Sequence, residues 1–180
     1  MSDLFDRVTD DRDFFKQLLS KLPGFKGYFE RQDRRASDKI LRETVANRFE
    51  EQWKRISELQ RDLISQGQIE LIDDLEGAAI KLRQFIDRVR TAAYGYAGFF
   101  DPVKIKEDEL AVVYQYDLML LNSVDAVTRA VDNVETSLGT DGLPAAIRNL
   151  RSISQQAVDA FERRNEAMIG GVSASGTSSQ

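Results

Sequence analysis

Residues 120–150, LLNSVDAVTRAVDNVETSLGTDGLPAAIRNL, decide the fold because they contain two helical patterns and the turn between them. Apolar residues recur every three or four positions on both sides of Gly139-Thr140-Asp141-Gly142, which is the spacing of one face of an α-helix. Pro144 lies two residues after the turn, and helices tolerate proline in their first positions. Because the connection is short, we expect the two helices to pack as antiparallel neighbours.

The register of this hairpin can be tested by arithmetic, since residues at one level of an antiparallel pair have position numbers with a constant sum. A sum of 281 pairs Val131 with Leu150 and matches the rest of the two apolar rows. The same sum places Asp117 opposite Arg164, so that one level of the core has a charge on both sides. We expect a partly buried structural ion pair that fixes the register, because losing either partner would strand a charge. The alternative is that Asp117 extends out to solvent.

The first half of the chain contains a second pair of helical patterns, over residues 28–65 and 68–97, separated at Gly67. A sum of 134 pairs Leu59 with Leu75 and Val45 with Val89. The second of these patterns keeps a heptad spacing typical of coiled coils. Neither hairpin can bury its apolar row alone, so the sequence predicts an all-α protein, an elongated antiparallel four-helix bundle made of two αα-hairpins.

Three regions follow from this pattern. Residues 1–26 form an N-terminal amphipathic segment that we expect to dock on the end of the bundle, and residues 27–169 form the bundle itself. Residues 170–180 are rich in Gly, Ser and Thr and have nothing to bury, so we expect a disordered tail.

The composition excludes several kinds of chemistry. The 180 residues include 25 Lys plus Arg and 30 Asp plus Glu, for a formal charge of −5, and no His or Cys. Without these two residue types there is no imidazole base, no thiolate, no disulfide and no usual zinc site, and the di-iron and haem sites of helical bundles typically need His. We therefore expect neither catalysis nor a metal or cofactor.

Charge and hydropathy also bear on partners and localisation. A net negative charge argues against nucleic acid as a partner, since phosphates need a basic face. The sequence contains no apolar run of membrane-spanning length, and its N-terminus does not resemble a signal peptide. We expect a cytoplasmic protein, and association with a membrane surface remains open.

Two regions form a candidate interaction end. Residues 24–42 carry six basic and three acidic side chains, net +3, and the arginines near the start of this helix oppose its macrodipole, which an acidic partner would offset. An aromatic stretch, residues 94–100, follows the third helix, and the hairpin registers place both regions at one end. The alternatives are a solvated helix face and an aromatic plug for the core. The candidate residues are Tyr28, Phe29, Arg31, Arg34, Arg35, Tyr94, Tyr96, Phe99 and Phe100.

A second apolar face lies in the N-terminal segment. It consists of residues at helical spacing, namely Phe14, Phe15, Leu18, Leu19 and Leu22. This face is either a lid on the bundle or an interfacial membrane helix, and the acidic residues at positions 10, 11 and 13 favour the lid because anionic lipid would repel them.

These features favour a non-catalytic helical protein-interaction or scaffold module that acts through one end of the bundle on another protein or on a second copy. One alternative is a peripheral membrane protein attached through residues 10–26. Another is a sensor that binds a small apolar ligand between the hairpins, in a pocket lined by Tyr94, Tyr96 and Trp53.

Overall fold

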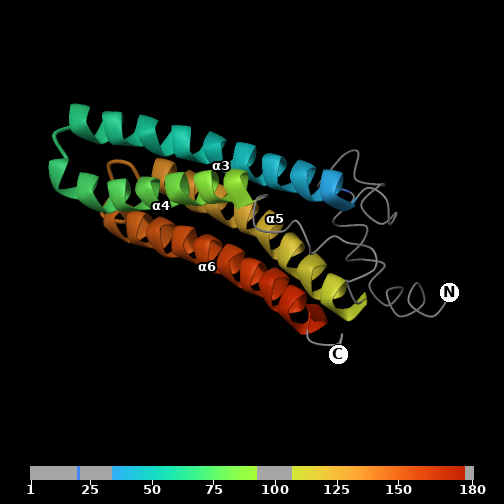
Figure 1. Ribbon diagram of the computed structural model, residues 1–180. Coiled ribbons are helices and arrows are strands. Elements are labelled where there is room, and N and C mark those ends of the chain that lie inside the picture. Colours follow the sequence, from blue (N-terminus) through green and yellow to red (C-terminus); the bar gives the residue numbers. More distant parts are fainter. Residues whose placement is uncertain (1–19, 21–33, 93–106, 177–180) are drawn as a thin grey trace.

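The computed structural model describes Ser20, residues 34–92 and residues 107–176, with side-chain positions for residues 38–92 and 115–169. Within these ranges lie four long helices and one turn of 3-10 helix, which are α3 (Arg34–Ser65), η3 (Ile69–Leu71), α4 (Ile72–Thr91), α5 (Glu107–Thr136) and α6 (Leu143–Gly176). Helix α3 forms a hairpin with α4, α5 forms a hairpin with α6, and the two hairpins pack into an elongated bundle (Figure 1). The all-α four-helix bundle predicted from the sequence is confirmed.

Glycine allows the chain to reverse between the helices of each hairpin. Gly67 and Gly139 adopt φ values of 76° and 73°, a left-handed conformation that glycine reaches without steric cost. At the end of α3 the N–H of Gln68 donates to the carbonyl oxygen of Leu63 at 3.0 Å, and the N–H of Gly67 donates to that of Ile64 at 3.0 Å. These two bonds form a Schellman motif, which satisfies carbonyls that a helix end would otherwise leave unpaired.

The bundle has two different ends. We call the end with Gly67 and Gly139 the turn end, because both hairpins reverse there. At the opposite end, the open end, α3 and α5 begin and α4 and α6 end (Figure 1).

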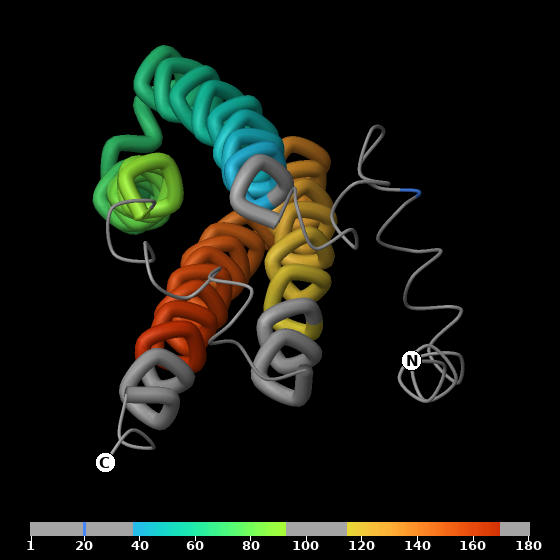
Figure 2. The backbone as a smooth tube through the Cα atoms, turned by 45° about the vertical axis from the view of Figure 1, so that its right-hand side comes forward, coloured from blue at the N-terminus to red at the C-terminus, as the bar shows by residue number. Residues whose placement is uncertain are grey.

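The two hairpins lie side by side, and each helix runs parallel to its neighbour in the other hairpin. Helix α4 contacts α6 through the ion pairs Asp74–Arg151 at 2.9 Å and Arg88–Glu162 at 2.7 Å, whose position numbers rise together along both helices. Helix α3 likewise contacts α5, and Figure 2 shows the two helices adjacent. The ring order is therefore α3, α4, α6, α5.

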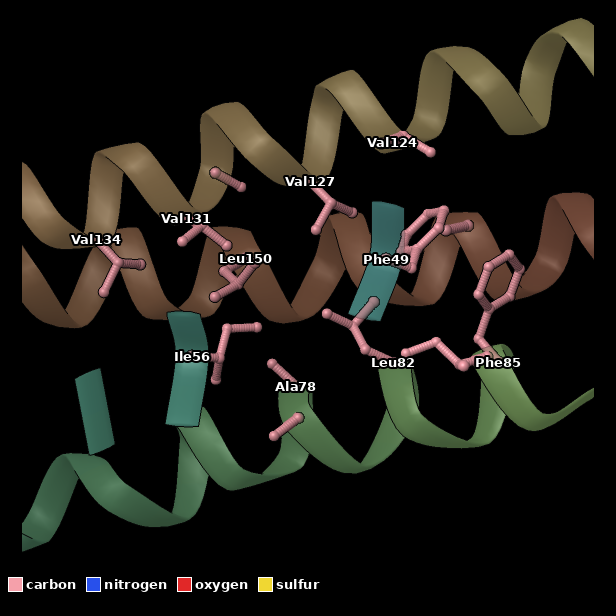
Figure 3. Close-up of a cluster of buried hydrophobic side chains, with 14 of the residues drawn as sticks. Phe49, Ile56, Ala78, Leu82, Phe85, Val124, Val127, Val131, Val134 and Leu150 are labelled. Carbon is pink, nitrogen blue, oxygen red and sulfur yellow. The ribbon is translucent and has the colours of Figure 1, made fainter. Parts of the chain in front are cut away.

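The core between the helices is filled with aliphatic and aromatic side chains (Figure 3). Three buried phenylalanines from different helices contact one another, namely Phe49 of α3, Phe85 of α4 and Phe161 of α6. The ring centroid of Phe85 lies 4.5 Å from that of Phe49 and 5.6 Å from that of Phe161. Trp53 packs at the edge of this core, and the guanidinium of Arg83 lies 5.5 Å from its ring centroid. Contacts of this kind bring three helices together at one level.

The hairpins are staggered along the bundle axis. Arg55 of α3 contacts Asp132 and Glu135 of α5, so these residues are at one level. Helix α3 continues ten residues past Arg55, to Ser65. Helix α5 ends at Thr136, only four residues past Asp132 and one residue past Glu135. Six or more residues of α3, about 9 Å of helix, therefore project beyond α5 at the turn end (Figure 1).

Helix α6 is longer than expected at its C-terminal end. Helix α6 extends to Gly176 and so includes residues 170–176, which we expected to belong to the tail. Adding residues to a helix that is already formed gains one hydrogen bond for each residue fixed, which is why a weakly apolar segment can continue it. The N-terminal segment, residues 1–26, lies outside the described residues apart from Ser20.

Candidate functional site

The ion pair expected from the sequence is present in the core near the open end. The Nε atom of Arg164 donates to Oδ1 of Asp117 at 2.5 Å, and both side chains are completely buried. Arg164 is the largest of the fully buried side chains. The pair is thus more deeply buried than expected, and Asp117 does not extend to solvent.

Two further charged residues, Asp38 and Arg42 of α3, join this pair. The Nη2 atom of Arg164 donates to Oδ1 of Asp38 at 2.5 Å, and the Nε atom of Arg42 donates to the other oxygen of the same carboxylate at 2.8 Å. Asp38 and Arg42 are 3% and 4% exposed, so the contacts are shielded from water. The result is a charge network of Asp117, Arg164, Asp38 and Arg42.

The network reaches all four helices. Arg42 also donates through Nη1 to the carbonyl oxygens of Val89 at 3.1 Å and Arg90 at 3.4 Å, in the last turn of α4. Carbonyls in the last turn of a helix have no partner within the helix and carry the negative end of its dipole, so a buried cation is well placed there. Through Nη1, Arg164 donates to the sulfur of Met168, one turn further along α6, at 3.0 Å.

The charges of the network balance, with two carboxylates and two guanidinium groups. Buried charges are costly unless they are paired and hydrogen-bonded, and these four are both. Carboxylates hydrogen-bonded to arginine from different helices are suited to fixing those helices. We conclude that the network locks the relative position of the four helices at the open end.

The sequence contained a signal for Asp38 and Arg42 that we misinterpreted. Asp38 lies three residues before Leu41, so it continues the row of core positions backwards along α3, and Arg42 follows it at i+4. We expected the charged side chains of residues 24–42 to form a solvated or partner-facing surface. For Asp38 this is wrong, because Arg164 and Arg42 supply partners that make its burial possible.

The structure locates part of the candidate interaction end. The backbone of Arg34 and Arg35 forms the start of α3 at the open end, close in sequence to the charge network. Their side chains lie outside the described residues, as do Tyr28, Phe29 and Arg31, the four aromatic residues within 94–100, and the apolar face of residues 14–22. Those assignments therefore stay predictions.

A shallow depression lies between α4 and α6 near the open end. It has a volume of about 300 Å³ and is open to solvent, with Arg88, Ala92, Glu162 and Ile169 among its walls. Ile169 is 57% exposed, and the Arg88–Glu162 ion pair crosses the wall at 2.7 Å. Trp53, one of the residues proposed to line a pocket in the sensor alternative, packs against the core, and the other two, Tyr94 and Tyr96, lie outside the described residues.

Surface ion pairs connect α3 to both of its neighbours. Arg90 of α4 donates to Glu50 at 2.5 Å and to Asn47 at 3.1 Å, and the hydrogen bond from Arg90 lowers the pKa of the Glu50 carboxyl below its ordinary value of 4.5. Arg55 binds Glu135 of α5 through two nitrogens at 2.7 and 3.0 Å, and this pairing raises the pKa of the guanidinium. A bidentate geometry of this kind fixes direction as well as distance.

Comparison with known proteins found no matching family model, no similar curated protein and no similar solved structure. Among the described residues, no helix has an apolar stretch long enough to cross a membrane, and no cluster of acidic side chains has the arrangement of a metal site.

Proposed function

We propose that the protein is a non-catalytic helical interaction module, and that it binds an acidic protein surface through the open end of the bundle. The observation that carries this proposal is the buried charge network, which ties all four helices together in the half of the bundle nearer that end. A binding surface gains affinity when the elements that present it are already fixed, because less entropy is lost on binding.

The charge at the start of α3, which is one side of the open end, supports an acidic partner. Of the six basic and three acidic residues in 24–42, Arg42 and Asp38 neutralise each other inside the network. Five basic and two acidic residues remain, so the formal charge left for a partner is still +3. The first turn of α3 contains Arg34 and Arg35 and no acidic residue, an arrangement that opposes the helix dipole. An acidic partner would offset that unfavourable placement.

Site-specific crosslinking tests the proposal. A photoreactive amino acid replaces Lys39, whose side chain is 68% exposed near the open end, and in a control it replaces Lys54, which is exposed further along α3. We expect position 39 to give crosslinked partners identifiable by mass spectrometry, and position 54 to give none.

Charge reversal then identifies the binding end. Arg34→Glu combined with Arg35→Glu should abolish the crosslinks from position 39, whereas Arg129→Glu combined with Arg148→Glu, which changes the charge equally on exposed sites elsewhere, should preserve them. Acidic groups favour a helix N-terminus, so a loss with the first pair would not come from unfolding of α3. Equal crosslinking from positions 39 and 54, or none from position 39, would contradict the proposal.

A further inference from the structure

The α3–α4 hairpin exposes several isoleucines near its turn. Six large apolar side chains are exposed among those with described positions, and three of them, Ile64, Ile69 and Ile80, lie within one stretch of 17 residues. Ile69 is 69% exposed and Ile80 is 49% exposed. Single exposed apolar residues are ordinary on a protein surface, but several gathered in one place indicate an interaction site.

Two of these isoleucines lie on one side of α4. Eleven residues separate Ile69 from Ile80, which is just over three helical turns, or about 16 Å along the axis. Asp73 and Glu76 lie between them at helical spacing, and both are exposed. Leu75, on the opposite side of the helix, is completely buried. Ile69, Asp73, Glu76 and Ile80 therefore form one row that faces away from the core, which we call the outer row of α4.

The outer row has no helix packed against it among the described elements. The main neighbours of α4 are α3, η3 and α6. Figure 2 shows α3 and α6 beside α4, and no described helix on its outer side. The face is thus available to a partner along its whole length.

The outer row is acidic. Residues 69–80 contain four acidic side chains and no basic one. Asp74 is bound by Arg151 of α6 at 2.9 Å. The other three make no ion pair within the part of the chain that the structure describes, namely Glu70, Asp73 and Glu76.

The basic side chains around the row have other partners. Arg61 and Arg83 each lie within 4.0 Å of an acidic side chain of their own helix. Lys81 donates to Gln155 of α6. Arg148 of α6 is exposed, but a single cation offsets at most one of three carboxylates. The outer row therefore keeps a negative charge beside its two isoleucines.

We infer that the outer row of α4 binds a basic amphipathic helix of another protein. A helix lying along α4 can place apolar side chains three turns apart against Ile69 and Ile80, with Lys or Arg between them against Asp73 and Glu76. Opposite charges then steer the encounter and fix the register of the two helices. This surface is separate from the open end, so the inference does not depend on the proposed function.

The chemistry of the row disfavours other occupants. An extended peptide would bury its own backbone polar groups against a helix whose N–H and C=O groups are already paired. The same face of a second copy carries the same negative charge and would be repelled. Nucleic acid and anionic lipid would be repelled for the same reason.

NMR titration of the isotope-labelled full chain tests the inference. The probe is a synthetic helical peptide of Leu and Lys, with Leu on one face, and the control peptide has Glu in place of every Lys. We expect the Leu/Lys peptide to shift the amide signals of residues 64–80, and the Leu/Glu peptide to shift none. Titration to about 1 mM detects even a weak complex, and added salt should weaken it.

Matched variants separate the apolar and the charged contributions. Ile69→Ser with Ile80→Ser should weaken binding about tenfold or more, as expected for two anchor residues. The control is Ile40→Ser with Met119→Ser, which removes two side chains that are 43% and 46% exposed on α3 and α5, and it should leave binding unchanged. Asp73→Asn with Glu76→Gln should weaken binding and reduce its dependence on salt. All these side chains are exposed, so each variant should fold as the wild type does.

Four results would overturn the inference. They are no shifted signals at about 1 mM Leu/Lys peptide, shifts centred outside residues 64–80, equal binding of the Leu/Glu peptide, and equal damage by the control variant. Shifts confined to residues 64–80, lost with the paired isoleucines and weakened with the paired carboxylates, would support it.

Discussion

The charge network makes a strong prediction about single and double substitutions. Asp117→Ala removes one of two carboxylates and leaves a net positive charge among side chains that are 0 to 5% exposed. Leaving a buried charge uncompensated costs about 3–5 kcal/mol of the free energy of unfolding. For a protein of this size, that loss corresponds to a decrease of roughly 6–20 °C in Tm.

Removing both partners should cost far less. In the double variant Asp117→Leu with Arg164→Leu, the remaining Asp38–Arg42 pair is neutral and keeps its hydrogen bond at 2.8 Å. Replacing a buried ion pair by apolar side chains of similar volume is often neutral or stabilising. Asp38 loses one arginine partner in this variant, so we expect its stability to lie within about 1.5 kcal/mol of the wild type, the net value of one hydrogen bond.

Urea unfolding followed by circular dichroism measures both quantities. The control is Asp62→Ala, which removes an exposed carboxylate and should change stability by less than about 0.5 kcal/mol. If the double variant is as unstable as Asp117→Ala, charge balance is not what stabilises the network, and our account of its role is refuted.

Two further predictions concern the interface between α3 and α4. Folding lowers the pKa of Glu50, so the bond to Arg90 should stabilise the protein fully above the unfolded pKa near 4.5 and be lost as the pH falls through the lower folded value. Carbon-13 NMR titration of the Glu50 carboxyl should show this, and Arg90→Gln should return the midpoint towards 4.5. Phe85→Ala removes a ring packed 4.5 Å from Phe49 and should cost about 3–5 kcal/mol in urea unfolding. A loss under about 1 kcal/mol would show that the aromatic contact contributes little to the packing of α3 on α4.

The four charges also explain why the bundle has a single register near its open end. Apolar rows alone tolerate shifts by a turn, because one aliphatic side chain can replace another at similar cost. A shift of α6 by one turn would separate Arg164 from both Asp117 and Asp38 and break the two buried hydrogen bonds that join them. The network therefore specifies position where the hydrophobic effect, which has no direction, does not.

Much of the fold and one part of the site could be predicted from the sequence, because they depend on residues close together along the chain. The spacing of apolar residues gave the helices, and Gly67 and Gly139 gave the reversals, where they adopt positive φ. Short turns fix which helices are antiparallel neighbours, and the constant-sum register then placed Asp117 opposite Arg164. Local periodicity and connection length are sufficient for these conclusions.

The arrangement of one hairpin on the other was decided only in three dimensions. Sequence spacing contains no information on whether α4 lies beside α5 or beside α6, since both choices bury the same apolar rows. The tertiary structure places α4 beside α6 and α3 beside α5, and only then does Asp38 meet Arg164, 126 residues away. The spacing of Asp38 continues the row of core positions, but spacing alone could not show that it is buried, because a charged side chain is buried only where a partner from another element is in reach.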